Sequence, residues 1–395
     1  MAKSITSITI LRLKLGMNNA KTDSNTHSHL MVPKRKSRIF IGLYETGDLT
    51  LRLSQGLRHW GFQVTNVVCE LPSPILEREI KHDRYIRRGH NHYVFQLRLI
   101  IEFLRQILRH DIFVFNWGQS FTGYLQHSGQ RLLRHLAYGD LAILKLLGKK
   151  IIVFAVGSDL RSPRLLIEEM KQAGLNQHAK YAAIELDMGT PGSEEIRNGK
   201  AKQIERYADY IFTRSDCAQF LKRDYYPLWL PVDLETLKFS EEKNLGPLAV
   251  VHAPSEPRVK GTKYVIEAVE KLKREGHPFQ FHLCSGMKNS EIREKLASAQ
   301  IAIDQLILPG YGLFAIEAMG SGCAVLGSAV AGYNGFPMEL PILTTTPDTI
   351  YKNLRLLLEE RELRTQIAQE GRAYVLKYHD HKKVSQDFLR LIGEI

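Results

Sequence analysis

The stretch from Gly310 to Ser328 combines small residues, one acid and an apolar run in an order that suits a phosphate-bearing ligand. A helix that starts at Gly312 presents its first backbone N–H groups and the positive end of its dipole to an anion. Glu317 follows about one turn later, where a carboxylate can accept hydrogen bonds from two ribose hydroxyls. The segment predicts half of a nucleotide-binding unit. The alternative is an ordinary strand–helix crossover whose glycines only permit close packing.

A second group of residues follows the expected strand Leu248–His252. Its loop delivers the cations Arg258 and Lys260 just before Gly261, which opens the next helix. Both cations could reach a β-phosphate and stabilise a departing nucleotide, so they are candidate catalytic residues. Two cations beside a glycine also occur on plain surface loops.

In the N-terminal half, polar and aromatic residues follow two more expected strands. The turn Gly157–Arg161 comes directly after the strand Ile151–Phe154 and contains Asp159, which could orient an acceptor hydroxyl or cap the next helix. Trp117 follows the strand Ile112–Asn116, where it could stack on a sugar or belong to the core.

These segments resemble the family 4 retaining glycosyltransferases, whose two-domain architecture is called GT-B. The donor-site pattern of that family is roughly E-x-F-G-L-x-x-x-E-A-M-A-x-G-x-P-V, and Tyr311–Leu313 and Glu317–Met319 fall in register with it. The resemblance implies that Glu317 holds the ribose and that the amides of Gly312 and Leu313 contact the phosphates. It also implies that Lys260 and Gly261 match the Lys-Gly pair that binds the diphosphate.

The chain departs from the family pattern at two positions that normally read the transferred sugar. The first acid of the donor pattern falls at Pro309, and the histidine of the family's H-G-x-D segment falls at Val156. The family's arginine falls near Pro254, so Arg258 is expected to substitute for it. Residues expected on the donor side are Gly261, Tyr311, Gly312, Leu313 and Glu317, and those expected on the acceptor side are Gly47, Trp117, Gly157, Ser158 and Arg161.

Length and composition bound the class of protein. A chain of 395 residues with 44% hydrophobic and 24% charged residues is expected to form two soluble globular domains. No run approaches the length of a membrane-spanning helix, and the four cysteines lack metal or redox spacing. The formal net charge of +12 arises entirely from the first 200 residues, which hold 29 Lys and Arg against 17 Asp and Glu. A basic half can attract an anionic membrane, nucleic acid or an acidic acceptor, or can simply be solvated.

Alternating strands and helices predict an α/β fold with two Rossmann-like parallel-sheet domains that face a cleft. We expect a disordered extension over residues 1–36, an acceptor-side domain over 37–235, and a nucleotide-sugar-binding domain over 246–395 whose last helix could cross back. The expected strands also include Arg38–Leu43, Gln63–Cys69, Phe279–Leu283 and Ala324–Leu326, and the expected helices are Leu49–Trp60, Val94–Arg109, Leu132–Leu147, Tyr264–Glu275 and Ser290–Ser298.

The helix Val94–Arg109 interleaves apolar residues with Arg98, Arg105 and Arg109, which is the composition of a membrane-surface helix. Its apolar face is also broad enough for an ordinary buried helix with basic residues outside. We favour core packing for this helix.

The sequence thus predicts a cytoplasmic glycosyltransferase, peripheral on the inner face of a membrane, that moves a sugar from a nucleotide-sugar donor to a glycan or lipid-linked acceptor with retention of configuration. No metal or other cofactor is expected. The alternative is a catalytically degenerate GT-B module that binds a nucleotide or glycan without transfer. Nucleic acid is an unlikely partner because no recognisable nucleic-acid-binding signature is present. The sequence does not identify the donor base, the sugar or the acceptor.

Overall fold

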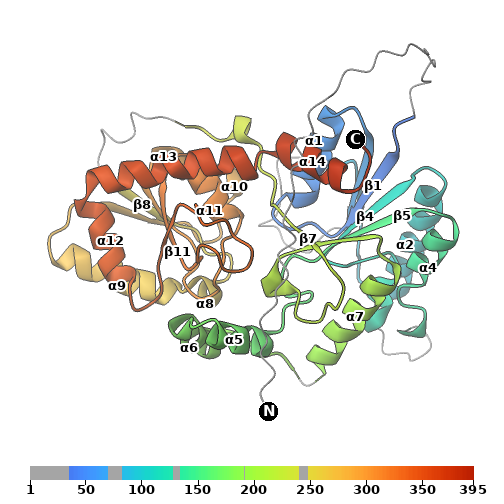
Figure 1. The fold of residues 1–395 in the computed structure, drawn as a ribbon, viewed down its shortest axis with the longest axis horizontal. Coiled ribbons are helices and arrows are strands. Elements are labelled where there is room, and N and C mark those ends of the chain that lie inside the picture. Colours follow the sequence, from blue (N-terminus) through green and yellow to red (C-terminus); the bar gives the residue numbers. More distant parts are fainter. Residues whose placement is uncertain (1–34, 70–81, 128–133, 191, 240–247) are drawn as a thin grey trace, which may run out of the picture. The chain divides into compact units, whose positions relative to one another are not determined.

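The computed structural model describes residues 35–69, 82–127, 134–190, 192–239 and 248–395. Within this part of the chain, strands and helices alternate around two parallel sheets (Figure 1), so the predicted α/β fold is confirmed. Residues 1–34 of the predicted N-terminal extension lie outside the described residues.

The first sheet has seven strands in the order β3-β2-β1-β4-β5-β6-β7. Its strands are β1 (Arg38–Leu43), β2 (Gln63–Cys69), β3 (Arg84–Ile86), β4 (Ile112–Asn116), β5 (Lys150–Phe154), β6 (Tyr210–Thr213) and β7 (Tyr226–Pro227). The strands are parallel, and the register pairs Ile39 with Val64 on one side and with Ile112 on the other. The carboxyl ends of β1, β4, β5 and β6 therefore share one edge, where parallel α/β sheets bind ligands.

The second sheet has five parallel strands in the order β12-β11-β10-β8-β9. Its strands are β8 (Ala249–His252), β9 (Gln280–Leu283), β10 (Ile301–Ile303), β11 (Ala324–Gly327) and β12 (Ile342–Thr344). In the register, Ile303 is paired with His252 and with Leu326. The loops that follow β8 and β10 consequently lie next to each other.

Helices cover both faces of each sheet, because the strand order runs outward in both directions and right-handed crossovers in opposite directions place their helices on opposite faces. Around the first half of the chain they are α1 (Leu49–His59), α2 (His92–Ile107), α4 (Gly139–Leu146), α5 (Pro163–Gln172), α6 (Asn176–Glu185) and α7 (Ser193–Tyr207). In the second half they are α8 (Pro257–Lys260), α9 (Thr262–Arg274), α10 (Asn289–Ser298), α11 (Leu313–Gly320), α12 (Ile350–Glu359), α13 (Arg361–Tyr378) and α14 (His381–Leu391).

The predicted helix Leu132–Leu147 is wrong in its extent. The chain turns over residues 136–138, and Tyr138 adopts a left-handed φ of 64° immediately before α4 begins at Gly139. The apolar periodicity continues through the turn, which is why the sequence alone does not separate the two segments.

Two helical segments pack away from the sheet that precedes them in the chain. Leu166 and Met170 of α5 share an apolar cluster with Val265 and Ile303 of the second sheet's layer. Conversely, Phe388 of α14 packs with residues of the first sheet and of α1, and Trp60 Nε1 donates a hydrogen bond to Lys382 O.

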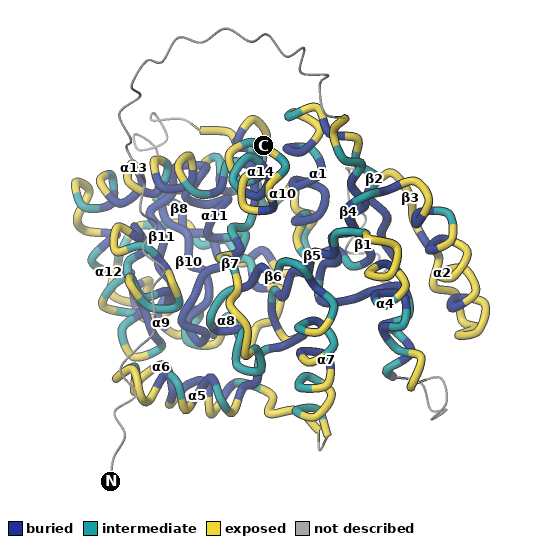
Figure 2. The backbone as a smooth tube through the Cα atoms, turned by 45° about the vertical axis from the view of Figure 1, so that its right-hand side comes forward, coloured by how far each residue is buried: buried dark blue, intermediate teal, exposed yellow. Residues whose placement is uncertain are grey.

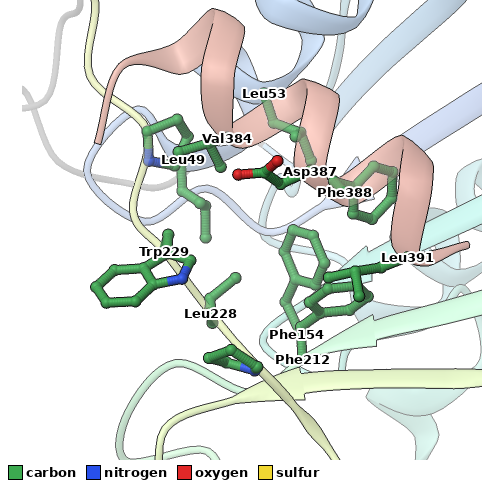
Figure 3. Close-up of a pocket in the computed structure, with 12 residues that line it drawn as sticks. Leu49, Leu53, Phe154, Phe212, Leu228, Trp229, Val384, Asp387, Phe388 and Leu391 are labelled. Carbon is green, nitrogen blue, oxygen red and sulfur yellow. The ribbon is translucent and has the colours of Figure 1, made fainter. Parts of the chain in front are cut away.

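The chain crosses between the two sheets along two segments that hydrogen-bond to each other. Val232 N–H donates to His379 O at 2.8 Å, and His381 N–H donates to Val232 O at 2.9 Å. Beside the first crossing lies a small apolar pocket of about 30 Å³, lined by Leu53, Phe212 and Phe388 among others (Figure 3). A volume of this order holds about one water molecule, so the pocket is too small for a nucleotide.

Candidate functional site

The start of α11 faces a buried acid that sequence reasoning missed. Asp304 follows β10 directly and is 1% exposed. Its Oδ2 accepts a hydrogen bond from Gly312 N–H at 3.1 Å, and its Oδ1 lies 2.6 Å from Lys260 Nζ. One carboxylate therefore joins the two donors that the sequence assigned to a diphosphate. An acid directly after a strand of a parallel sheet was the available signal.

Lys260 is held more tightly than an exposed lysine. Its side chain is 12% exposed, and Nζ also contacts Gln305 Oε1 at 3.4 Å. Gln305 in turn donates to Gly310 O at 2.7 Å, which fixes the loop before α11. The ammonium group and the helix start are thus held together by one polar network.

The neighbouring residues Arg258 and Gly261 differ in their surroundings. The Arg258 side chain is 60% exposed, and its Nε lies 3.9 Å from Glu185 Oε2. Gly261 has a left-handed φ of 71°, and a Cβ there would lie 3.0 Å from Leu306 Cβ. Glycine is therefore required at the junction of α8 and α9, whereas Arg258 is less constrained than Lys260.

Glu317 is buried and paired. Its Oε1 accepts hydrogen bonds from Arg293 Nε at 3.1 Å and Nη2 at 2.7 Å, and its side chain is 8% exposed. Burial raises the pKa of the Glu317 carboxyl, and the Arg293 charge opposes that shift. Arg293 lies in α10, outside the donor pattern, and was missed by sequence reasoning.

Arg52 of α1 adds a second guanidinium near this pair. Its side chain is 3% exposed, and Nη1 bonds to Gln55 Oε1 and Asp233 Oδ2, both at 3.0 Å. Its buried Nη2 has no hydrogen-bond partner in the described structure. Burial lowers the pKa of Arg52, and the nearby Arg293 charge lowers it further. The sequence signal that could have identified Arg52 is a charged residue within the apolar first turns of α1, Leu49–Leu53.

The loop after β1 contacts the start of α11. Gly47 has a left-handed φ of 56°, and a Cβ there would lie 2.1 Å from Leu313 Cδ1. The structure therefore brings the acceptor-side Gly47 against the donor-side Leu313, and any side chain at Gly47 would displace this contact.

Tyr311 turns its side chain into the core. The side chain is buried, and its hydroxyl lies 3.0 Å from both Tyr374 Oη and His379 Nε2. Its carbonyl oxygen accepts a hydrogen bond from Arg214 Nη1 at 2.8 Å. Tyr311 thus positions the loop before α11, and its phenol is not available to a ligand.

Asp159 does not cap the following helix. Ser162 is the N-cap of α5, whereas Asp159 Oδ1 accepts the N–H groups of Gly157 at 2.7 Å and Val156 at 3.2 Å. Its other oxygen, Oδ2, is buried and has no hydrogen-bond partner in the described structure. Burial raises the pKa of Asp159, while the charge of Lys200 opposes the shift. An unpaired acceptor of this kind can receive a ligand hydroxyl.

Trp117 and Tyr44 form an aromatic pair beside this acid. Their ring centroids lie 4.9 Å apart at 31°, and Trp117 has a left-handed φ of 61°. A Cβ on Gly157 would lie 3.5 Å from the indole, so the ring packs over that glycine. Trp117 O accepts a hydrogen bond from the buried Lys200 at 3.2 Å. Trp117 as a whole is partly exposed, as a sugar-stacking residue must be.

The remaining residues expected on the acceptor side, Ser158 and Arg161, have different surroundings. Ser158 is exposed, and its carbonyl contacts Arg197 Nε at 3.4 Å. Arg161 is instead bound to Asp216, which Arg214 also contacts. Burial would raise the pKa of Asp216, but the two guanidinium groups outweigh it and hold the pKa below its ordinary value. Arg161 therefore has a structural partner rather than an acceptor-facing side chain.

No three His, Cys, Asp or Glu side chains are grouped as a metal ion would require within the described residues. None of the helices in that part of the chain is both long and apolar enough to span a bilayer.

Residues 313–390 match a family model described as glycosyl transferase-like. No curated protein matches the sequence.

Many solved structures resemble nearly the whole chain. They include an alpha-glucosyltransferase in complex with UDP-glucose and DNA containing an abasic site (TM-score 0.55, 12% identity, 90% of this chain and 99% of that one), sucrose-phosphate synthase from Thermosynechococcus elongatus (0.60, 14%, 91% and 99%) and UDP-GlcNAc 2-epimerase from Neisseria meningitidis bound to UDP-GlcNAc (0.53, 10%, 90% and 99%). At these identities the likeness shows the fold, and the predicted GT-B architecture is confirmed.

Proposed function

We propose, from the GT-B fold of this chain and its glycosyl transferase-like residues 313–390, that the protein is a nucleotide-sugar-dependent glycosyltransferase. It transfers the sugar with retention of configuration to a glycan or lipid-linked acceptor. One observation carries the proposal. Lys260 Nζ and Gly312 N–H converge on the same carboxylate, that of Asp304, so they can also converge on the oxygens of a diphosphate.

In this proposal the donor diphosphate replaces Asp304 as the partner of Lys260 and the α11 start. The ammonium group then balances the charge that develops as the nucleotide departs. Glu317, one turn into α11, binds the ribose hydroxyls. Arg293 of α10 fixes the orientation of the Glu317 carboxylate. The unused Nη2 of Arg52 supplies one further donor for the nucleotide.

The acceptor lies against Asp159 and Trp117. The unpartnered Oδ2 of Asp159 accepts a hydrogen bond from the acceptor hydroxyl that receives the sugar. The indole of Trp117 stacks on the sugar ring of the acceptor. The acceptor hydroxyl oxygen bonds to the anomeric carbon on the same face from which the nucleoside diphosphate departs, and its proton passes to Asp159, so no protein nucleophile takes part. This step rests on the resemblance to family 4.

The test is calorimetry of the purified full chain with UDP, GDP, ADP and their sugar conjugates. We expect micromolar binding of one nucleotide and its loss in Lys260→Met, but not in the control Lys352→Met, which changes an exposed lysine of α12. Absence of any nucleotide binding, or equal binding by both variants, would reject the donor site.

A binding module without transfer is the second candidate, because Val156 and Pro309 stand at the two positions where the family pattern has the residues that read the transferred sugar. Release of free nucleotide or of a glycosylated acceptor from the bound donor distinguishes the two. Binding of the donor without formation of either product would identify the protein as a binding module.

A further inference from the structure

Helix α2 carries a row of large apolar side chains on its outer side. Figure 2 shows much of this helix as exposed, and Leu97, Leu104 and Leu108 are 56%, 60% and 80% exposed. We define the α2 stripe as Tyr93, Val94, Leu97, Ile100, Ile101, Leu104 and Leu108. Single exposed apolar residues are normal, but six on one helix with a seventh at its C-cap form a continuous patch.

The stripe is separate from the core-facing side of the same helix. Phe95, Leu99, Phe103 and Ile107 are buried in the cluster that covers the first sheet. At 3.6 residues per turn, the stripe spans an arc of about 120° on the opposite side. Core packing, which the sequence favoured, therefore explains only half of the helix. The outer apolar residues contribute nothing to the described core.

Cations border the stripe along one edge. Arg98, Arg105 and Arg109 occupy the adjacent arc, and Arg87 and Arg88 precede the helix and are exposed. The acid of α2, Glu102, is 3% exposed and is bound by Arg84 at 3.1 Å and by Arg105 at 2.8 Å. The outer side of α2 therefore presents apolar and positively charged groups together.

A smaller patch of the same kind lies on α4. Ile143, Leu146 and Leu147 are 45%, 86% and 54% exposed, and Lys145 lies among them. The acid of this helix, Asp140, is buried. Leu141 and Leu144 pack in the same cluster as the buried side of α2, so both helices cover one face of the first sheet.

We propose that the α2 stripe docks on the surface of a bilayer that contains anionic lipids. The helix lies in the plane of the interface, with the stripe among the acyl chains and the arginines at the phosphates. A second copy of the chain fits less well, because a two-fold contact would place the arginine edges of both copies at one buried interface. Nucleic acid would bind the arginines but would leave the stripe in water.

The test is co-sedimentation of the full chain with phosphatidylcholine vesicles that contain or lack phosphatidylglycerol. The stripe variant is Leu97→Glu with Leu104→Glu. Its matched control is Met338→Glu with Leu376→Glu, which adds the same charge at residues that are 77% and 51% exposed outside α2 and α4. We expect binding only to the anionic vesicles, weaker binding at high salt, and a loss of at least about tenfold in the stripe variant alone.

Three results would overturn the docking proposal: no binding to anionic vesicles, equal loss in both double variants, or a wild-type dimer that the stripe variant dissociates in sedimentation velocity. Thermal melts and nucleotide binding of each variant check that it is folded. Because the stripe is tested on vesicles without donor or acceptor, its failure and the failure of the glycosyltransferase proposal are separate results.

Discussion

Asp304 Oδ1 lies 2.6 Å from Lys260 Nζ, while Oδ2 of the same carboxylate accepts the N–H of Gly312. A buried acid thus occupies the position in which the sequence predicts a diphosphate. The two anions compete for the same donors, and the affinity for the nucleotide is set by the difference between them.

Removing the charge of Asp304 should strengthen nucleotide binding. Asp304→Asn keeps the size of the side chain but leaves Lys260 with a neutral partner, so we expect the dissociation constant for the preferred nucleoside diphosphate to fall by about tenfold, which corresponds to 1.4 kcal/mol. Titration calorimetry measures it. Weaker binding instead would mean that Asp304 orients Lys260 rather than competing with the ligand.

Lys260→Met should lower both binding and stability. The substitution leaves Asp304 buried without its cation, at a cost of about 3 kcal/mol in the free energy of unfolding. The double variant Lys260→Met with Asp304→Asn should recover most of that stability but none of the nucleotide affinity. Urea unfolding of the four proteins in the cycle gives the coupling energy. Additive effects of the two substitutions would contradict a paired Lys260 and Asp304.

Arg293→Met should destabilise the protein in a pH-dependent manner. Glu317 already has a raised pKa because of burial, and removing Arg293 takes away the charge that opposes the rise. A folded-state pKa above the unfolded value means that stability is lost as pH rises above about 4.5. The free energy of unfolding of the variant should therefore lie further below that of wild type at pH 8 than at pH 5, with a difference of about 3 kcal/mol at neutral pH, as measured by urea unfolding. Arg390→Met, at an arginine 58% exposed, is the control.

Asp159→Asn should separate transfer from donor binding. The amide keeps an oxygen for Gly157 N–H but cannot accept a proton from an acceptor hydroxyl as a carboxylate does. We expect transfer to fall by roughly 100-fold or more, with the nucleotide dissociation constant unchanged. Asp187→Asn, at an exposed aspartate, should have no effect. Parallel loss of binding and transfer would place Asp159 outside the acceptor site.

His379 should make the protein sensitive to acid. Burial lowers the pKa of His379 to about 4 and outweighs the hydrogen bond to Leu230 O, which raises it. The other ring nitrogen lies 3.0 Å from Tyr311 Oη. The unfolded chain takes up a proton near pH 6.5, so stability is complete above that value and is lost as pH falls toward 4. The loss is on the order of 3 kcal/mol. The urea unfolding midpoint of His379→Gln should vary less with pH than that of wild type. The control His135→Gln, at an exposed histidine, should show the same pH dependence as wild type.

Four of the seven strands of the first sheet, β1, β2, β4 and β5, were predictable because each is a short apolar run next to a turn signal, whereas β3, β6 and β7 were not predicted. β1, β2 and β4 have the predicted bounds, and Gly312 and Glu317 lie at the start and inside of α11. Apolar runs and glycines act locally, so their consequences can be inferred from adjacent residues.

The partners of the site residues were not predictable in the same way. Asp304 is 44 residues from Lys260, and Arg293 is 24 residues from Glu317. The side chains of Lys260 and Glu317 are nearly buried, at 12% and 8% exposed. Such pairs depend on which loops the sheet order brings together, and nothing in the spacing of the residues states that order.

Helices α5 and α14 show the same limit. Their amphipathic patterns indicate a buried face, but not which sheet that face meets. Leu166 meets the second sheet and Phe388 the first, in each case across a crossing of the chain.

The position of α14 has a consequence for folding during translation. Phe388, Leu389 and Ile392 complete the apolar layer over Leu49 and Leu53, residues translated more than 300 positions earlier. On the ribosome, the first sheet emerges long before this cover exists. Helix α1 covers part of that face of the sheet, and the rest stays uncovered until α14 has been made.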